Sequence, residues 1–216
     1  MKITIREPGS AITHYIGMLL SLFAAAPLLV KAAGSGIPSA ITAMGIFILA
    51  MILLYAASSI YHAVNVKDKV LKIFRKLDHS MIFILIAGTY TPVCMLVLGG
   101  KTGMYLLALV WGIAIGGIVL KMCWINCPKW FSSVIYIAMG WVCVLVFPAL
   151  WEKLPALAFA WLLAGGILYT VGGIVYALKL KGFNGAHKYF GSHEIFHLFV
   201  MAGSFCHFIV MYCFVV

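Results

Sequence analysis

Long apolar runs separated by short polar stretches divide the chain into seven segments. Each run has the length of about 20 residues that an α-helix needs to cross the hydrocarbon layer of a membrane. A helix satisfies its backbone hydrogen bonds internally, as a membrane interior requires. The pattern therefore predicts one domain, residues 1–216, made of seven membrane-spanning helices. The predicted spans are residues 12–33, 38–63, 77–98, 102–121, 131–150, 155–178 and 193–215.

The composition of the chain agrees with a membrane location. Hydrophobic residues make up 65% of the 216 positions, charged residues only 9%, and the mean hydropathy is +1.12. A water-soluble globular protein carries about 25% charged residues. The first apolar run is too long for a cleavable signal sequence and lacks a small-residue cleavage site, so it is expected to remain as a span. The predicted fold class is an all-α, multi-pass protein of the cell membrane.

Lysine and arginine are distributed unevenly between the two ends of the predicted spans. If the spans alternate in direction, 12 of the 15 basic residues fall on one side, namely Lys2, Arg6, Lys67, Lys69, Lys72, Arg75, Lys76, Lys121, Lys129, Lys179, Lys181 and Lys188. Only Lys31, Lys101 and Lys153 fall on the other side. Because short basic loops stay in the cytoplasm, the N-terminus is predicted to be cytoplasmic and the C-terminus outside. The net charge of +10 then reflects topology and attraction to membrane lipids, and no nucleic-acid partner is expected.

Five polar residues are predicted to meet at the cytoplasmic ends of three spans. Ser58 and His62 lie four residues apart at the end of span two, and Asp78 lies at the start of span three. His193 and His197 open the last span. Residues four apart share one face of a helix, and imidazole and carboxylate groups are common zinc ligands, three of which are typical of a catalytic site. The candidate zinc ligands are therefore His62, Asp78, His193 and His197. The six cysteines offer no second pair for a structural zinc site.

Several neighbouring polar residues have two open interpretations. Glu7 and His14, at the cytoplasmic end of span one, are either ordinary interfacial residues or neighbours of the polar site. Asp78 is either a site residue or one half of an interfacial ion pair with Lys76 or Arg75. His79 is rotated by about 100° from Asp78 on the same helix, so it is expected to pack or to support the site rather than to bind the metal.

The middle spans contain features that predict helix packing. Pro92 is expected to kink span three, and His207 lies about 15 Å along the last helix from His197, too far to bind the same metal. His207 is therefore expected to face an interior cavity or another helix. Glycines in spans four and six are expected to allow close helix approach. These are Gly112 and Gly116 in span four and the pairs Gly165–Gly166 and Gly172–Gly173 in span six.

The motif residues resemble those of the hemolysin III branch of the progesterone and adipoQ receptor (PAQR) family. The resemblance rests on Ser58-x3-His62, Asp78 and His193-x3-His197, and on the strings YHAV, LDHSMIFILIAGTYTPV, AMGW and HEIFHLFVMAGSFCHF, and it covers essentially all seven spans. It implies a zinc ion held by three histidines, which correspond to His62, His193 and His197. Asp78 and Ser58 then lie close to a zinc-activated water as catalytic residues, with Asp78 bound to the zinc directly or through that water.

The same resemblance extends to membrane hydrolases that include alkaline ceramidases. It implies a lipid amide or ester as the substrate, cleaved in the cytoplasmic leaflet, and a role in membrane lipid homeostasis. A zinc that only ties helices together would instead make the protein a sensor or receptor. His193-Glu194-x-x-His197 also matches the HExxH motif of metalloproteases, in which the glutamate is the general base. Glu194 is equally explained as an acidic residue in the first turn of a helix. A pore is disfavoured because the acidic residues lie near span ends.

Overall fold

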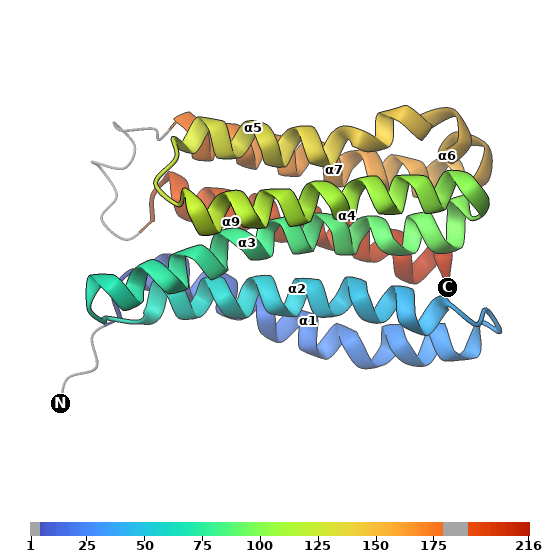
Figure 1. The fold of residues 1–216 in the computed structure, drawn as a ribbon. Coiled ribbons are helices and arrows are strands. Elements are labelled where there is room, and N and C mark those ends of the chain that lie inside the picture. Colours follow the sequence, from blue (N-terminus) through green and yellow to red (C-terminus); the bar gives the residue numbers. More distant parts are fainter. Residues whose placement is uncertain (1–4, 179–189) are drawn as a thin grey trace.

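The computed structural model describes residues 5–178 and 190–216, and seven long apolar helical spans make up most of this part of the chain (Figure 1). The helices are α1 (Pro8–Gly34), α2 (Ala40–Ala63), α3 (Asp68–Pro92), α4 (Gly100–Cys123), α5 (Lys129–Gly140), α6 (Phe147–Lys153), α7 (Ala156–Leu178) and α9 (Ser192–Val210). A π-helical segment, Val93–Leu98, continues α3, and a second one, Met211–Val215, follows α9. The predicted seven-span, all-α fold is confirmed.

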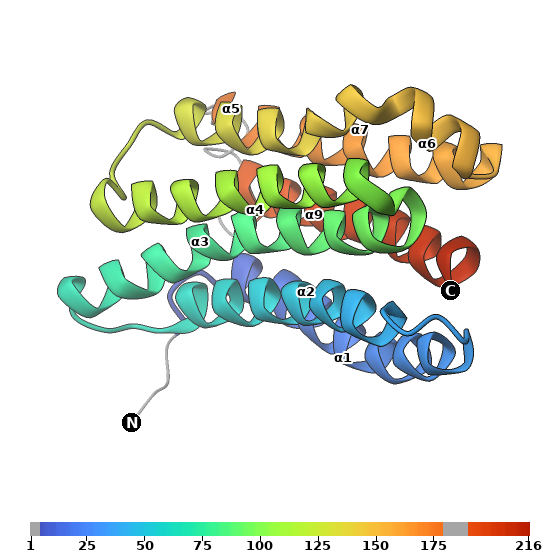
Figure 2. The same ribbon diagram turned by 45° about the vertical axis from the view of Figure 1, so that its right-hand side comes forward.

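The spans form a bundle in which α3, α4 and α9 lie between two outer groups. Figures 1 and 2 show α1 and α2 together on one side and α5, α6 and α7 on the other. The two chain ends lie at opposite ends of the bundle, as an odd number of spans requires (Figure 1). The assignment of the N-terminal end to the cytoplasm stays a prediction of the charge pattern. This prediction rests on 12 basic residues. Four of them, Lys2, Lys179, Lys181 and Lys188, lie outside the described residues.

The third span begins nine residues earlier than predicted. Only residues 64–67 separate α2 from α3, so the basic stretch expected to be a loop forms the first turns of α3 instead. Charged residues are excluded from hydrocarbon, but they do not prevent a helix from continuing into water. The start predicted from hydropathy, residue 77, is therefore where the apolar run begins and not where the helix begins. Asp78 consequently lies about 15 Å along α3 from its first residue.

The fifth span is not one continuous α-helix. It consists of α5, a 3₁₀ segment at Trp141–Val146, and α6, and Pro148 lies in the first turn of α6. Tyr90 of α3 compensates for the irregular backbone, because its hydroxyl donates to the Gly140 carbonyl at 2.6 Å and accepts from the Cys143 N–H at 2.8 Å. Backbone groups freed inside a membrane protein require such partners.

Glycines allow close helix contacts, but at different positions in α4 from those expected. A Cβ atom on Gly112 or Gly116 would have no neighbour within 4 Å, so the prediction for this pair is wrong. Gly117 is the close contact, because a Cβ atom there would lie 2.2 Å from Cε1 of Phe83 on α3. In α7 the prediction holds for Gly165, Gly172 and Gly173, but not for Gly166, where a Cβ atom would have no neighbour closer than 3.9 Å; on Gly165 it would lie 2.5 Å from the His207 ring.

Candidate metal centre

Three histidines from two helices meet at the end of the bundle that carries the N-terminus. His62 lies in the last turn of α2, and His193 and His197 lie in the first two turns of α9. One ring nitrogen from each histidine lies within 4.8 Å of the others, and Nε2 of His62 is 3.1 Å from Nε2 of His193. His62 and His197 are each only 2% exposed. The convergence predicted from the alternation of the spans is therefore present.

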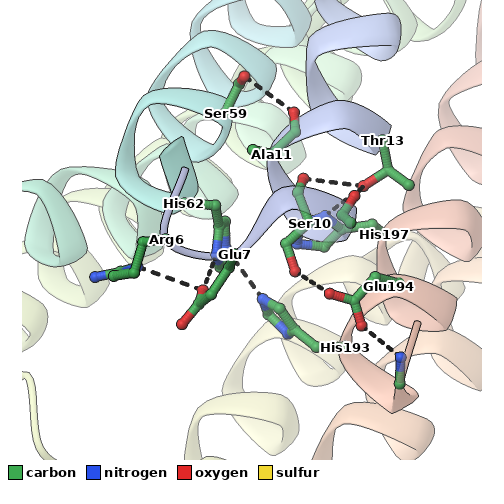
Figure 3. A network of polar contacts seen from close by, with 12 residues as sticks. Arg6, Glu7, Ser10, Ala11, Thr13, Ser59, His62, His193, Glu194 and His197 are labelled. Atoms are coloured by element: carbon green, nitrogen blue, oxygen red, sulfur yellow. Dashed lines mark hydrogen bonds and ion pairs between the residues drawn. The ribbon is translucent and has the colours of Figure 1, made fainter. Parts of the chain in front are cut away.

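The remaining ring nitrogens orient two of these side chains. Nδ1 of His62 is paired with the Glu7 carboxylate, and Nδ1 of His197 lies 3.0 Å from the Thr13 hydroxyl (Figure 3). A carboxylate can only accept from His62, so Nδ1 carries the proton and Nε2 presents a lone pair. Tetrahedral zinc with bonds of 2.0–2.1 Å holds its ligand nitrogens about 3.3 Å apart, close to the 3.1 Å between Nε2 of His62 and Nε2 of His193. The three histidines could therefore hold a metal ion of this kind.

Glu7 is held in place from two sides. Its backbone N–H donates to the His62 carbonyl at 3.0 Å, and its side chain also lies 3.4 Å from Arg6. The hydrogen bond with His62 lowers the pKa of Glu7 from 4.5 to about 2 and outweighs the opposing effect of its partial burial. Glu7 is therefore ionised at neutral pH. Metal-binding histidines commonly pair with such a carboxylate, so of the two interpretations of Glu7, the structure favours a role at the site.

His14 also belongs to the surroundings of the centre. Its ring stacks on that of His197, with the ring centroids 3.5 Å apart and the planes inclined by 6°. His14 is 3% exposed, and its ring nitrogens have no hydrogen-bond partner among the described residues. Sequence reasoning left His14 open and missed Thr13. A threonine in an apolar run is ordinary, and only the packing of α1 on α9 reveals its contact.

Asp78 and Ser58 lie next to the three histidines rather than among them. Both are buried, and the Ser58 hydroxyl is within hydrogen-bonding reach of the Asp78 carboxylate. Asp78 is not one of the residues whose ligand atoms cluster within 4.8 Å. The alternative ion pair with Lys76 or Arg75 is wrong, because the structure pairs Asp78 with no lysine or arginine in the described ranges. Lys76 instead donates to the Met122 carbonyl, and Arg75 donates to the Asn126 side chain at 3.3 Å. Direct coordination by Asp78 stays a prediction.

The Glu194 carboxylate forms hydrogen bonds with groups other than the three histidines. It accepts the Gly191 N–H at 2.7 Å and the hydroxyl of Ser10 on α1 (Figure 3). This is the arrangement of a glutamate that caps the start of its own helix. The interpretation of Glu194 as an acidic residue in the first helical turn is therefore the one that its contacts favour.

Two cavities meet at this centre. A mostly apolar cavity of about 150 Å³ runs inside the bundle, from Ser58 and His197 as far as His207. A second cavity of about 270 Å³ is bordered by polar side chains that include Glu7 and His62. His193 and Asp78 line both cavities, together with His79 and Tyr176. His79 thus borders the site, and its carbonyl accepts the Tyr136 hydroxyl at 3.1 Å. A molecule in the apolar cavity would reach the candidate centre from inside the bundle.

The fold and the site define a class: a multi-pass α-helical membrane protein with a buried three-histidine centre that can hold a metal ion. Comparison with known proteins agrees. The family described as "Haemolysin-III related" matches residues 3–208, and the chain belongs to this family. The resemblance found in the motifs is therefore confirmed, and so is the location in the cell membrane.

Individual relatives extend this result. The chain is 42% identical to "Hemolysin-3" of Bacillus cereus over 198 residues, which cover 92% of this chain and 86% of the relative. It is 40% identical to the "Hemolysin-3 homolog" of Bacillus subtilis over 215 residues, covering 97% and 96%. A shorter stretch of 60 residues is 35% identical to the "Adiponectin receptor protein" of Drosophila melanogaster, covering 26% of this chain and 14% of that protein. This local match connects the chain with the wider PAQR family.

Proposed function

We propose that this protein is a zinc-dependent hydrolase that cleaves an amide or ester bond of a membrane lipid and so contributes to membrane lipid homeostasis. One observation carries the proposal: Asp78, beside the three histidines, lines both the apolar and the polar cavity. A lipid chain in the apolar cavity would place its carbonyl next to Asp78, while water enters from the polar cavity. This is the geometry that hydrolysis of a membrane lipid needs.

The side chains supply the remaining roles. A zinc ion held by His62, His193 and His197 would polarise the carbonyl and make water more acidic. Asp78 accepts a proton as the water oxygen adds to the carbonyl carbon, and it returns the proton to the leaving nitrogen or oxygen as the C–N or C–O bond breaks. Ser58, buried beside Asp78, would help to orient the Asp78 carboxylate. The products are a fatty acid and an amine or alcohol.

The competing functions have less support. In a metalloprotease, Glu194 would act as general base, but its carboxylate is occupied by Gly191 and Ser10. A pore would need a polar path, whereas the cavity inside the bundle is mostly apolar. A sensor or receptor with a structural zinc would use the same three histidines as ligands. It differs from the hydrolase only in that it would not need Asp78 to accept a proton.

The decisive experiment is Asp78→Asn in purified protein reconstituted into lipid nanodiscs. We expect zinc content to stay near that of the wild type, while release of fatty acid from a panel of N-acyl and ester lipids falls by about 100-fold or more, because a general base is lost. Glu194→Gln is the matched acid-to-amide control and should have a mild effect. Undiminished hydrolysis in Asp78→Asn would refute Asp78 as the general base, and no hydrolysis of any lipid by zinc-loaded wild type would favour the sensor.

A further inference from the structure

Two basic side chains border the polar cavity beside the candidate metal centre. Arg75 lies on α3 and Lys129 is the first residue of α5, and both line this cavity together with Asp78 and His193. Both side chains are partly exposed, so a molecule in the cavity can contact them. Basic pockets between membrane helices on the cytoplasmic side are typical binding places for the head groups of anionic lipids.

The contacts of the two basic groups leave their positive charge available to a ligand. Arg75 donates to the neutral side-chain oxygen of Asn126 at 3.3 Å, and among the residues that the structure describes it forms no ion pair with a carboxylate. A guanidinium has five N–H donors, and two of them can hold a phosphate in parallel. Nζ of Lys129 lies 4.4 Å from the centre of the Tyr176 ring, a contact that positions a cation without neutralising it.

Two of the acidic groups that border the cavity are already engaged by other residues. The Glu7 carboxylate pairs with His62, and the Glu194 carboxylate accepts from Ser10 and from the start of its own helix. These acids belong to the segment before α1 and to α9, whereas the basic residues belong to α3 and α5. The cavity therefore offers positive charge on helices other than those that carry these two carboxylates.

The position of Arg75 relative to Asp78 indicates which part of a lipid would meet it. The two residues are three apart on α3, so they share a face of the helix, with Arg75 about 4.5 Å nearer the helix start. Asp78 also lines the apolar cavity, whereas Arg75 and Lys129 line only the polar one. A lipid with its acyl chain in the apolar cavity and its carbonyl at Asp78 would therefore direct its head group toward the two basic residues.

We propose that Arg75 and Lys129 form a subsite for the phosphate group of a lipid head group. Binding of the phosphate does not require hydrolysis, whereas the idea that the bound lipid is also the substrate rests on the proposed function. In phosphate-bearing glycerolipids and sphingolipids, only a short polar backbone separates the phosphate from the acyl carbonyl. The substrate class is therefore an acyl ester or amide of a lipid that carries a phosphate, rather than a neutral lipid.

The test is equilibrium binding of two lipids that differ only in the phosphate, dihexanoyl phosphatidic acid and dihexanoylglycerol. The protein is purified, zinc-loaded wild type in an uncharged maltoside detergent, which supplies no competing phosphate. We expect phosphatidic acid to bind about tenfold more tightly, as hydrogen bonds to charged groups in a partly exposed site allow. Equal affinities for the two lipids would overturn the proposal.

Variants connect this preference to the two basic residues. Arg75→Gln should bring the two affinities to within about twofold of each other, because the paired donors are lost. Lys129→Gln should reduce the advantage by about threefold, because a lysine acts as a single point charge. Lys72→Gln is the matched control, since it removes one charge from an exposed position on α3 that does not border the cavity. An equal loss in Lys72→Gln and Arg75→Gln would show general attraction to a basic surface and refute the subsite.

Two further measurements identify what holds the phosphate and where the phosphate comes from. A metal ion also attracts phosphate, so the pair of lipids is compared again after zinc is removed with a chelator. The advantage of phosphatidic acid should persist, and its disappearance would refute the role of Arg75 and Lys129. Inorganic phosphate at the same concentration should not displace phosphatidic acid, and effective displacement would exclude a lipid as the specific ligand.

The outcome for this subsite can be separated from the outcome for the hydrolase. A preference for phosphatidic acid without hydrolysis of any lipid would retain the subsite and refute the hydrolase. Hydrolysis combined with equal affinities for the charged and the neutral lipid would retain the hydrolase and refute the subsite.

Discussion

Neutralising Glu7 tests whether the histidine cluster is a metal centre without changing any of its ligands. Glu7→Gln keeps an oxygen that can accept from Nδ1 of His62, so the change removes mainly the negative charge. The loss of a carboxylate that supports a metal-binding histidine commonly weakens metal affinity 10- to 100-fold. The Glu7 side chain is 47% exposed, and solvent screening of an exposed pair places the expected effect near tenfold.

A tenfold loss corresponds to about 1.4 kcal/mol of binding free energy. At a fixed zinc concentration well above the dissociation constant, the stabilisation of the folded protein by zinc should fall by the same amount. Two measurements check this: competition for zinc with a chelator of known affinity, and thermal unfolding with and without zinc. Without zinc, Glu7→Gln should unfold at a somewhat lower temperature than wild type, because the lowered pKa of Glu7 means that its charge also stabilises the zinc-free fold, and this difference is subtracted from the effect of zinc.

Two matched variants separate the effect of this carboxylate from general changes in charge. Glu152→Gln makes the same substitution at an exposed position in α6 and should leave zinc affinity unchanged. Arg6→Gln removes the other charged partner of Glu7, at 3.4 Å, and should have a smaller effect than Glu7→Gln. If Glu7→Gln binds zinc as tightly as wild type while His62→Ala loses zinc, the carboxylate does not support the ligand. If His62→Ala also keeps full zinc, the centre itself is wrongly assigned.

Two further predictions follow from the packing. Thr13→Val removes the hydroxyl 3.0 Å from Nδ1 of His197, and zinc affinity measured by chelator competition should fall by roughly fivefold, while Thr13→Ser should restore it. Gly117→Ala would place a Cβ atom 2.2 Å from Phe83 and should destabilise the protein by about 1–3 kcal/mol in reversible unfolding, whereas Gly116→Ala should be nearly neutral, since no atom lies within 4 Å. Equal stabilities of the two alanine variants would contradict the packing of α4 on α3.

The sequence predicts the seven spans well because membrane crossing leaves a strong, simple signal of apolar length. Its errors concern helical residues outside the apolar runs and the face that a helix turns toward its neighbour. Asp68 to Lys76 look like a loop by hydropathy, yet they form the first turns of α3, because a helix can extend into water. The spacing of Gly112 and Gly116 similarly identifies a face of α4 but not the neighbour it meets. The close contact through Gly117 depends on the position of Phe83 on the preceding helix, α3, which no local pattern around Gly117 reveals.

The residues of the candidate site also differ in how well the sequence predicts them. His62, His193 and His197 can be predicted because helix periodicity and an even number of intervening spans together bring them to one face and one depth. Glu7 can be identified as a candidate, but its role depends on a contact with His62 across 55 residues. The role of Thr13 leaves no trace in the sequence, since it follows from a single neighbouring group, the His197 ring, on another helix.

The contacts of α1 explain why stability alone cannot distinguish a catalytic zinc from a structural one. Glu7, Ser10 and His14 are spaced by three and four residues, so they form one stripe that faces the ends of α2 and α9. Through this stripe α1 contacts His62, Glu194 and His197, and an ion that joins α2 to α9 would therefore tighten three helices at once. Loss of zinc should loosen these helices whether the ion catalyses a reaction or not. Asp78 is the residue that separates the two roles: it lies outside the ligand cluster, so its conversion to asparagine tests the chemistry while leaving the histidines that would hold the ion in place.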